Sequence, residues 1–375
     1  MLSSPLSRAL AGSLLIGFAS TGCGSSEQAP ATPSPDAGQG GSGGAVQPDA
    51  GFTCTEGDSL DLDGIFALYA RLSLTFLSHP GGAVTVCPVD QTSDGTFLAL
   101  VEIKHSPGGV EVESVRASVC SLTLPEISAV VGDCDPSAPN VVWAGLRFPQ
   151  VLIDTLPLTP VAQATGVLDA AQAGANLELS RMTFSIGTRQ KGDAMPGWQS
   201  EVDGCGMADV APGRGATCDE KCVQGCPELV DDDGDGWPGV TVHVCGVTED
   251  DKKSKVPCNA ENPSEPGVAI QGRAVLDLQV DPLFRPRVRS SCELEGGFET
   301  EIRYNVCGAD LYLSNTPISV TSAIASLPIY VVNSHLSEFR AVRIDGRHGA
   351  PSWEPDFSNP LETCRRVIEH QNELK

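Results

Sequence analysis

An acidic run in the middle of the chain carries the residue types best suited to bind a metal ion. Asp231, Asp233 and Asp235 alternate along this run, and Gly236 follows the last of them. Carboxylates on alternate residues of a tightly curled loop converge on one point, and a glycine without a Cβ permits the sharp turn there. Oxygen ligands of this kind select a hard cation. The spacing therefore predicts a calcium site, with the carbonyl of Trp237 as a further ligand.

The calcium motif is incomplete at its far end. Position 12, where an EF-hand carries a bidentate glutamate, is Val242, and the surrounding VTVHV run alternates as a strand does. The loop resembles the EF-hand-like calcium loops of thrombospondin type 3 repeats and of many secreted bacterial proteins. That resemblance implies calcium without implying a particular activity. We expect the missing ligand to come from Glu249, Asp250 or Asp251.

Charge repulsion gives the expected cation a structural role. Seven carboxylates and no Lys or Arg lie between Asp231 and Asp251. The segment therefore repels itself when no cation is bound, and calcium would order its backbone. The alternative interpretation is a solvated acidic turn that binds no metal.

The start of the chain contains targeting and tether signals. Arg8 precedes an apolar run of signal-peptide length, too short for a permanent membrane helix, which ends in STGC. Small residues directly before a cysteine resemble the lipobox of bacterial lipoproteins. The resemblance implies that Cys23 is acylated and, with Gly24 next, anchored in the outer membrane, on its periplasmic face or at the cell surface. Residues 24–51 are rich in Gly, Ser and Pro, which predicts a flexible linker.

The balance of charge argues against two classes of partner. The chain has 48 acidic and 24 basic residues, a formal net charge of −24, and no basic cluster. Nucleic acid and anionic lipid surfaces are poor partners for such a field. We therefore expect contact with a membrane through the lipid anchor, and no nucleic-acid binding.

The cysteines predict disulfide bonds. The chain has 14 cysteines, of which thirteen remain when Cys23 is set aside. In an exported chain such residues pair with one another. The odd number leaves at least one thiol free or bonded outside the chain. A zinc site is the alternative for the densest group, although its spacing matches no standard zinc pattern. That group comprises Cys205, Cys218, Cys222, Cys226 and Cys245.

Hydrophobic alternation predicts a mainly β protein. Leu72, Leu74 and Phe76 alternate with polar residues, and Gly, Pro and Asp clusters separate the runs that follow. We expect an antiparallel sandwich or up-and-down barrel halves. A Gly64-x-Phe66 start resembles that of lipocalin-like barrels, with Phe in place of Trp. Further strands are expected at 96–103, 110–120, 141–148, 151–158, 176–186, 268–280, 298–306, 309–313, 323–332 and 339–344.

The end of the chain predicts a short helix. Pro360 stands at a first helical position, and Leu361, Cys364 and Val367 recur at helical spacing. Cys364 would staple this helix to the sheet. The expected organisation is a signal peptide (1–22), a lipidated cysteine and linker (23–51), a β-rich domain (52–200), a cysteine-rich acidic insert (201–266) and a second β-rich domain with the helix (267–375).

No catalytic motif accompanies these features. The six histidines are scattered, and the sequence contains no HExxH, GxSxG, Walker or GxGxxG motif. We expect a lipid-anchored, extracytoplasmic calcium-binding protein of structural or ligand-binding type, and the absence of a catalytic motif favours a binding protein over an enzyme. A lipocalin-like carrier of a small apolar ligand is one version of this function. The alternatives are a calcium-dependent hydrolase with dispersed catalytic residues and a calcium-dependent adhesion module.

Overall fold

The structure, a computed structural model, describes residues 53–80, 84–87, 91–131, 141–196, 229–236, 239–318 and 328–375. The signal peptide, Cys23 and the linker lie outside these residues. So do Trp237 and the cysteines between 205 and 226.

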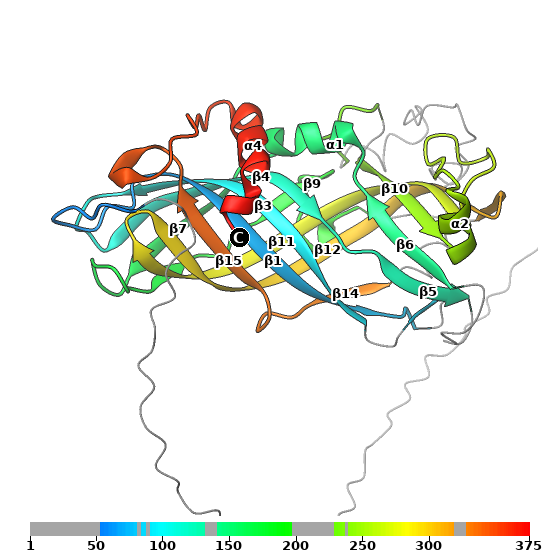
Figure 1. Cartoon of the computed structure of the whole chain (residues 1–375), viewed down its shortest axis with the longest axis horizontal. Coiled ribbons are helices and arrows are strands. Elements are labelled where there is room, and N and C mark those ends of the chain that lie inside the picture. The colour runs from blue at the N-terminus through cyan, green and yellow to red at the C-terminus, as the bar shows by residue number, and fades with distance from the viewer. Residues whose placement is uncertain are drawn as a thin grey trace, which may run out of the picture. The chain divides into compact units, whose positions relative to one another are not determined.

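The chain folds as one antiparallel sheet of fifteen strands, which confirms the predicted mainly β fold (Figure 1). The strands are β1 (Gly64–Leu77), β2 (Val84–Val86), β3 (Gln91–His105), β4 (Glu111–Thr123), β5 (Ile127–Val131), β6 (Val142–Arg147), β7 (Ala162–Leu168), β8 (Leu177–Leu179), β9 (Phe184–Ile186), β10 (Val240–Val247), β11 (Ile270–Ser290), β12 (Glu293–Leu313), β13 (Thr316–Ile318), β14 (Ile329–Val332) and β15 (Glu338–Arg343). Their order is β2-β5-β6-β10-β11-β12-β15-β1-β3-β4-β7-β8, with β13 on β12, β14 on β1 and β9 on β11.

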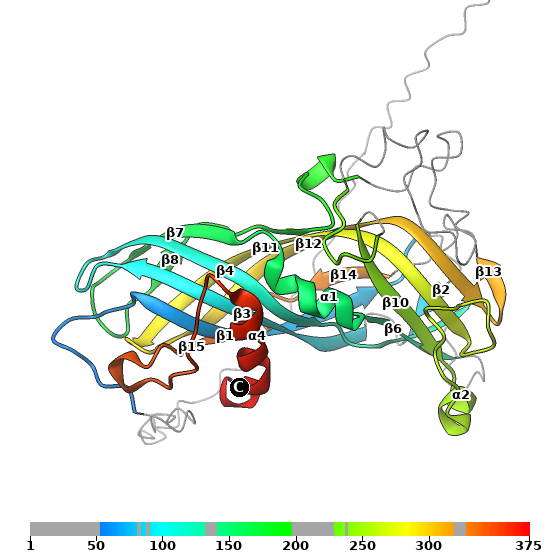
Figure 2. The ribbon, with the colours of Figure 1, turned by 90° about the horizontal axis from the view of Figure 1, so that it is seen from above.

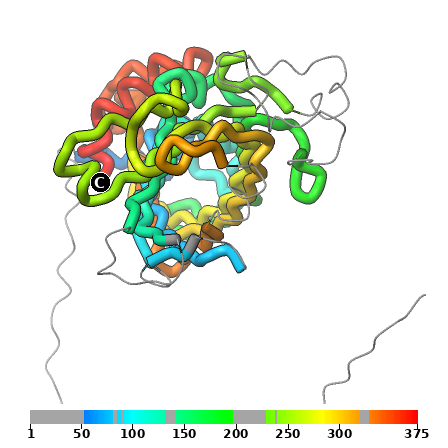
Figure 3. Tube along the Cα trace, turned by 90° about the vertical axis from the view of Figure 1, so that its right-hand side faces the viewer, coloured from blue at the N-terminus to red at the C-terminus, as the bar shows by residue number. Residues whose placement is uncertain are grey.

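Strands from before and after the acidic segment share this sheet. β10 pairs with β6 on one side and with β11 on the other, and β15 lies between β12 and β1. Seen end-on, the strands curl around the interior (Figure 3). An isolated bridge between Asn176 and Arg287 brings the start of β8 against β11. The edge of the sheet that ends in β8 therefore curls round until it meets β11.

Alternation along β11 separates the interior from the outer face. Leu276, Leu278 and Val280 line an interior cavity, because successive side chains of a strand point to opposite faces. Asp277 and Gln279 lie between them and point outward, yet both are buried. The segment that follows β9 contributes to this cover, since the Gly192 N–H donates to the Gln279 side chain.

The strand predicted at 151–158 is wrong. This segment forms the helix α1 (Gln150–Thr155) and the 3₁₀ turn η1 (Leu156–Leu158). Leu152 and Leu156, four residues apart, are buried, whereas Leu158 is 62% exposed. Burial at helical spacing decides the conformation of a run that is too short for periodicity to distinguish helix from strand.

The predicted C-terminal helix is present as α4 (Pro360–Glu369). It packs against β3 and β4 on the outside of the sheet (Figures 1 and 2). A Cys120–Cys364 disulfide joins the helix to β4, as the sequence predicts for Cys364. The remaining helices are α2 (Glu249–Ser254), η2 (Gly192–Ala194), η4 (Arg347–Gly349) and η5 (Gln371–Glu373).

The predicted disulfide bonding is confirmed in the described chain. Cys54 bonds to Cys292 and Cys245 bonds to Cys258, in addition to the pair that holds α4. Cys307 is buried and free. It lies at a β-bulge, since the register of β12 against β11 shifts beside it. Among the described residues, no helix is both long and apolar enough to cross a bilayer.

Candidate functional site

An apolar cavity lies inside the curled sheet. It encloses about 90 Å³ and its described lining exposes no polar atom. Side chains from β1, β3, β4, β6, β9, β11, β12 and β14 form its wall. An apolar cavity of this size stays dry and offers a site to a small apolar molecule.

A second, smaller hollow of about 40 Å³ continues the interior on the other side of a group of phenyl rings. Phe97, Phe184 and Phe284 line both spaces. Phe97 and Phe184 meet edge to face with ring centroids 5.7 Å apart. Phe284 meets Phe339 edge to face at 5.0 Å. The interior is therefore one apolar lumen that aromatic side chains divide into two parts.

Two tyrosines form the polar margin of the larger cavity. The rings of Tyr304 and Tyr330 meet edge to face at 5.5 Å. The Tyr304 hydroxyl donates a hydrogen bond of 2.9 Å to the carbonyl of Pro328. Burial raises the pKa of Tyr304 to about 12 and also raises the pKa of Tyr330. Both hydroxyls are therefore neutral at physiological pH, so the wall carries no charge.

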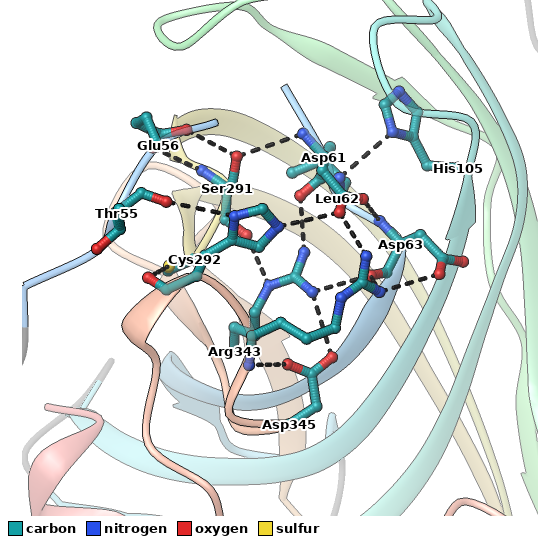
Figure 4. A network of polar contacts seen from close by, with 12 residues as sticks. Thr55, Glu56, Asp61, Leu62, Asp63, His105, Ser291, Cys292, Arg343 and Asp345 are labelled. Atoms are coloured by element: carbon teal, nitrogen blue, oxygen red, sulfur yellow. Dashed lines mark hydrogen bonds and ion pairs between the residues drawn. The ribbon is translucent and has the colours of Figure 1, made fainter. Parts of the chain in front are cut away.

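The segment before β1 closes one end of this lumen. Leu60 and Leu62 are buried in the core that the sheet encloses. The Leu62 N–H donates to His105 on β3, and the Asp61 N–H donates to the hydroxyl of Ser291 between β11 and β12 (Figure 4). We call residues 54–63 the N-terminal strap.

A buried arginine holds the strap in place. The Arg343 side chain has no exposed surface, and it donates to the carbonyls of Asp61, Asp63 and Ser291 at 2.7–2.8 Å (Figure 4). Burial lowers the pKa of Arg343, while Asp345, 3.2 Å away, opposes that shift. A buried charge with this many partners is satisfied, so the network fixes three segments to one another.

The histidine of this network is engaged on both sides of its ring. Nε2 of His348 lies 3.0 Å from a carboxylate oxygen of Asp61, and Nδ1 lies 3.3 Å from the carbonyl of Thr55. The Ser291 hydroxyl donates to Glu56 at 2.7 Å. In this cluster the histidine has no ring nitrogen left to take a proton from the serine. The contacts therefore attach the strap to the sheet, and they do not pair a nucleophile with a base.

The acidic loop brings together the three aspartates that alternate in the sequence. Carboxylate oxygens of Asp231, Asp233 and Asp235 all lie within 4.8 Å of one another. Gly234 and Gly236 have φ angles of +71° and +89°, a region that glycine adopts without strain. Their N–H groups donate to the two oxygens of Asp231 at 2.7 and 3.0 Å, which curls the loop around the carboxylates.

Asp233 is the unusual member of this group. It has no exposed surface; one oxygen accepts a 2.7 Å hydrogen bond from the Thr241 N–H, and the other is buried without a partner. Burial raises the pKa of Asp233 to about 7, and the charges of Asp235 and Asp231 add to the shift. A cation at the point where the three carboxylates meet would supply the missing partner.

Asp232 attaches the loop to the rest of the protein. Its carboxylate accepts two hydrogen bonds from Arg189, of 2.6 and 2.8 Å, and one of 2.7 Å from the Gly187 N–H. Positions 231, 233 and 235 thus face one another while position 232 faces the segment after β9. Arg189 and Thr241 are contacts that the sequence motif does not include.

The other predicted ligands occupy different places. Glu249, Asp250 and Asp251 form the first turn of α2 and are not part of the group of three aspartates. Asp251 accepts hydrogen bonds from both the N–H and the hydroxyl of Thr248, which caps the helix. Trp237 lies outside the described residues. Cys245, a member of the alternative zinc group, is bonded to Cys258.

Comparison with known proteins adds no family to these observations. No family model matches the chain, and no curated protein matches its sequence. The function must therefore be argued from the lumen and the acidic loop alone.

Proposed function

We propose that this chain is a lipid-anchored, extracytoplasmic protein that binds a small apolar ligand inside its curled sheet. The carrying observation is the apolar lumen, in which a cavity of about 90 Å³ exposes no polar atom of its described lining. Burying apolar surface of a ligand there is favourable by about 25 cal/mol per Å². The disulfides support an oxidising compartment, and the lipobox-like STGC sequence supports anchoring through Cys23.

The size of the lumen limits the ligand. Drug-sized molecules occupy pockets of roughly 300–1,000 Å³, whereas the two hollows have about 90 and 40 Å³. A ligand of a few carbon atoms or a single ring fits without rearrangement, and a longer chain requires the phenyl rings between the hollows to move.

Uptake of a fluorescent apolar probe tests this proposal. N-phenyl-1-naphthylamine is larger than a single ring, so it binds only if the phenyl rings between the two hollows move; it should show a saturable rise in emission with the purified chain starting at Gly24, and benzene should compete with it. Leu278→Phe fills the cavity from its wall and should weaken binding by about tenfold, because overpacking of an apolar site costs about 1–3 kcal/mol. Leu313→Phe adds the same ring at a partly exposed position of β12 and is the matched control. Equal binding by both variants would remove the lumen as the site.

We propose that calcium binding is a second, structural function of the same protein. The observation that favours it is the buried Asp233 oxygen without a partner, which faces two further carboxylates. Asp231, Asp233 and Asp235 would hold the ion, with the remaining ligands from water or from neighbouring groups. Calorimetric titration of the chelator-treated chain, with thermal unfolding recorded with and without calcium, tests it. Saturable heat with a raised Tm is expected; no heat would leave a solvated acidic turn.

A further inference from the structure

We propose that the ligand reaches the lumen sideways, through a gap in the sheet between β8 and β11, and that Phe284 is the gate it passes. This inference rests on the ligand-binding function proposed above and adds the route and the residue that controls it. The route follows from an interrupted strand ladder, a groove outside it and a closed end beside it.

The strand ladder is interrupted on one edge of β11. β11 pairs with β9 up to Val280 and meets the start of β8 again at Arg287. In the interval between these points, all of whose residues the structure describes, no ladder pair joins β11 to β8; a backbone hydrogen bond of 3.1 Å from the Met182 N–H to the Pro282 carbonyl crosses its start. Pro282 and Pro286 lie in this interval, and proline has no N–H to donate to a neighbouring strand. The sequence of β11 thus keeps the interval open.

An open groove of about 610 Å³ lies outside the gap; we call it the outer groove. The β7–β8 hairpin forms one wall and residues 283–286 of β11 form the other. Its apolar floor is shared with the smaller hollow of the lumen, since Leu177, Leu179 and Pro286 line both. Val167, 53% exposed, stands at the rim. Apolar side chains therefore lead from solvent to the interior.

Phe284 is the side chain that separates these spaces. It lines the outer groove, the smaller hollow and the larger cavity. Its ring centroid lies 5.3 Å from that of Phe298 and 5.0 Å from that of Phe339. A change in the Phe284 rotamer is a local motion, and it would join the groove to the lumen without breaking a ladder hydrogen bond.

The end of the sheet next to this gap is closed to a ligand. The N-terminal strap crosses it, with Leu62 fully buried and with Arg343 joining two carbonyls of the strap to that of Ser291. Moving the strap would take two hydrogen-bond acceptors away from that buried charge, at a cost of several kcal/mol. Moving one phenyl ring costs far less, so the side route is favoured over this end.

A cross-link across the gap tests the route. Continuing the register of the Asn176–Arg287 bridge by two residues places Glu178 opposite Arg285, and both side chains are exposed. The double substitution Glu178→Cys with Arg285→Cys should form a disulfide that closes the gap. We expect uptake and release of N-phenyl-1-naphthylamine, followed by stopped flow, to slow by about tenfold or more with similar Kd, because only the barrier changes.

A matched double variant, Glu178→Ser with Arg285→Ser, removes the same charges without a cross-link and should exchange the probe at the original rate. Cross-linked protein that exchanges the probe as fast as this control would overturn the side route. Mass spectrometry of the unreduced protein establishes that the new bond has formed.

Substitution of the gate is the second, independent measurement. Phe284→Ala should speed both uptake and release by about tenfold. Phe148→Ala removes a ring of the same size from the larger cavity, and Phe148 lines neither the outer groove nor the smaller hollow, so this variant should change affinity and leave the uptake rate within about twofold. Equal acceleration by both variants would overturn the assignment of Phe284 as the gate.

The failure of this inference is distinguishable from failure of the proposed function. A chain that binds the probe with rates indifferent to the cross-link and to Phe284 has a lumen site reached by another route. A chain that never binds the probe has neither.

Discussion

The Thr241 N–H donates to one carboxylate oxygen of Asp233 at 2.7 Å, while the other oxygen of Asp233 remains buried with no partner. Thr241 is the second residue of β10, and β10 pairs with β6 and β11. The acidic loop is therefore attached directly to the central part of the sheet. A ligand that binds the free oxygen of Asp233 would therefore stabilise a residue that is hydrogen-bonded to the start of β10.

Asp233→Asn should weaken calcium binding while leaving the fold intact. The asparagine retains an oxygen that can accept from Thr241, but it removes one of three charges that would hold the ion. We expect the calcium affinity to fall by at least about tenfold, since affinity depends on the number of charged ligands. The Tm of the variant should no longer respond to calcium. The circular dichroism signal of the strands should be unchanged.

Asp250→Asn is the control for the Asp233→Asn substitution. It also tests the prediction from the sequence that α2 supplies a calcium ligand. Asp250 is 92% exposed on α2 and pairs with Lys253 at 3.3 Å. We expect its substitution to leave calcium affinity within about twofold. A loss equal to that of Asp233→Asn would show that α2 supplies the missing ligand, as the sequence predicts.

Removing the Cys120–Cys364 disulfide should cost more stability than removing Cys245–Cys258. The first pair is 244 residues apart in sequence and the second is 13 apart. In the chain-entropy description, closing a longer loop restrains the unfolded chain more. We expect the double alanine variant of the first pair to lose about 2 kcal/mol more than that of the second. Denaturant unfolding of the two variants, with equal m-values, provides the comparison; equal losses would contradict it.

Local patterns explain what could be predicted from the sequence. Leu72, Leu74 and Phe76 alternate with polar residues within one strand, and all three are buried in β1. Such alternation involves only neighbouring residues, so it can be recognised from the sequence. The three aspartates of the acidic loop lie within five residues, so their convergence is also local. Cys364 is on the predicted helix, but its partner Cys120 is 244 residues away and could not be chosen from the sequence among the twelve other cysteines besides Cys23.

Contacts between residues distant in sequence explain which features could not be predicted from the sequence. Phe97, Phe184 and Phe284 come from three strands that are well separated in sequence, and only the sheet order places them around one lumen. The Arg189–Asp232 contact spans 43 residues. Within β11, Pro282 and Pro286 would ordinarily argue against a long strand. They are accommodated because no strand ladder on this edge of β11 requires an N–H from them; only the Pro282 carbonyl accepts a backbone hydrogen bond there, from the Met182 N–H.

Arg343→Met should destabilise the protein strongly. The substitution leaves the carbonyls of Asp61 and Ser291 without this donor, and the Asp63 carbonyl keeps only its hydrogen bond from Arg347. We expect a loss of about 3–5 kcal/mol in the free energy of unfolding. The N-terminal strap should also become accessible to protease, because its main attachment is gone. Limited proteolysis and denaturant unfolding measure the two effects.

Arg347→Met is the matched control for this prediction. Arg347 contacts the carboxylates of Asp61 and Asp63, but its own side chain is 43% exposed. Solvent screens such a pair, so its loss should cost about 1 kcal/mol or less. If the two variants lost the same free energy of unfolding, burial of Arg343 would not explain how strongly the network stabilises the protein.

Asp277→Asn should stabilise the protein at neutral pH and flatten its dependence on pH. Asp277 has no exposed surface, and burial raises its pKa to about 6 from an ordinary value of 3.8. The folded protein therefore binds more protons than the unfolded chain between these values. Its stability falls as pH rises through this interval and then stays at the lower level, because the ionised carboxylate is buried.

The asparagine variant should lack that fall. Its side-chain oxygen can still accept from the Asn305 N–H, as the Oδ1 of Asp277 does at 3.1 Å. The nearby Cys307 thiol does not titrate in this range, since burial raises its pKa to about 12. At pH 7.5 we expect a gain on the order of 2 kcal/mol over the original protein, shrinking toward zero at pH 4. Chemical unfolding between pH 4 and 8, with Asp250→Asn as the exposed control, measures the difference. A constant offset at every pH would show that the pKa of Asp277 is the same in the folded protein as in the unfolded chain, because its carboxyl would then contribute no proton uptake on folding within this range.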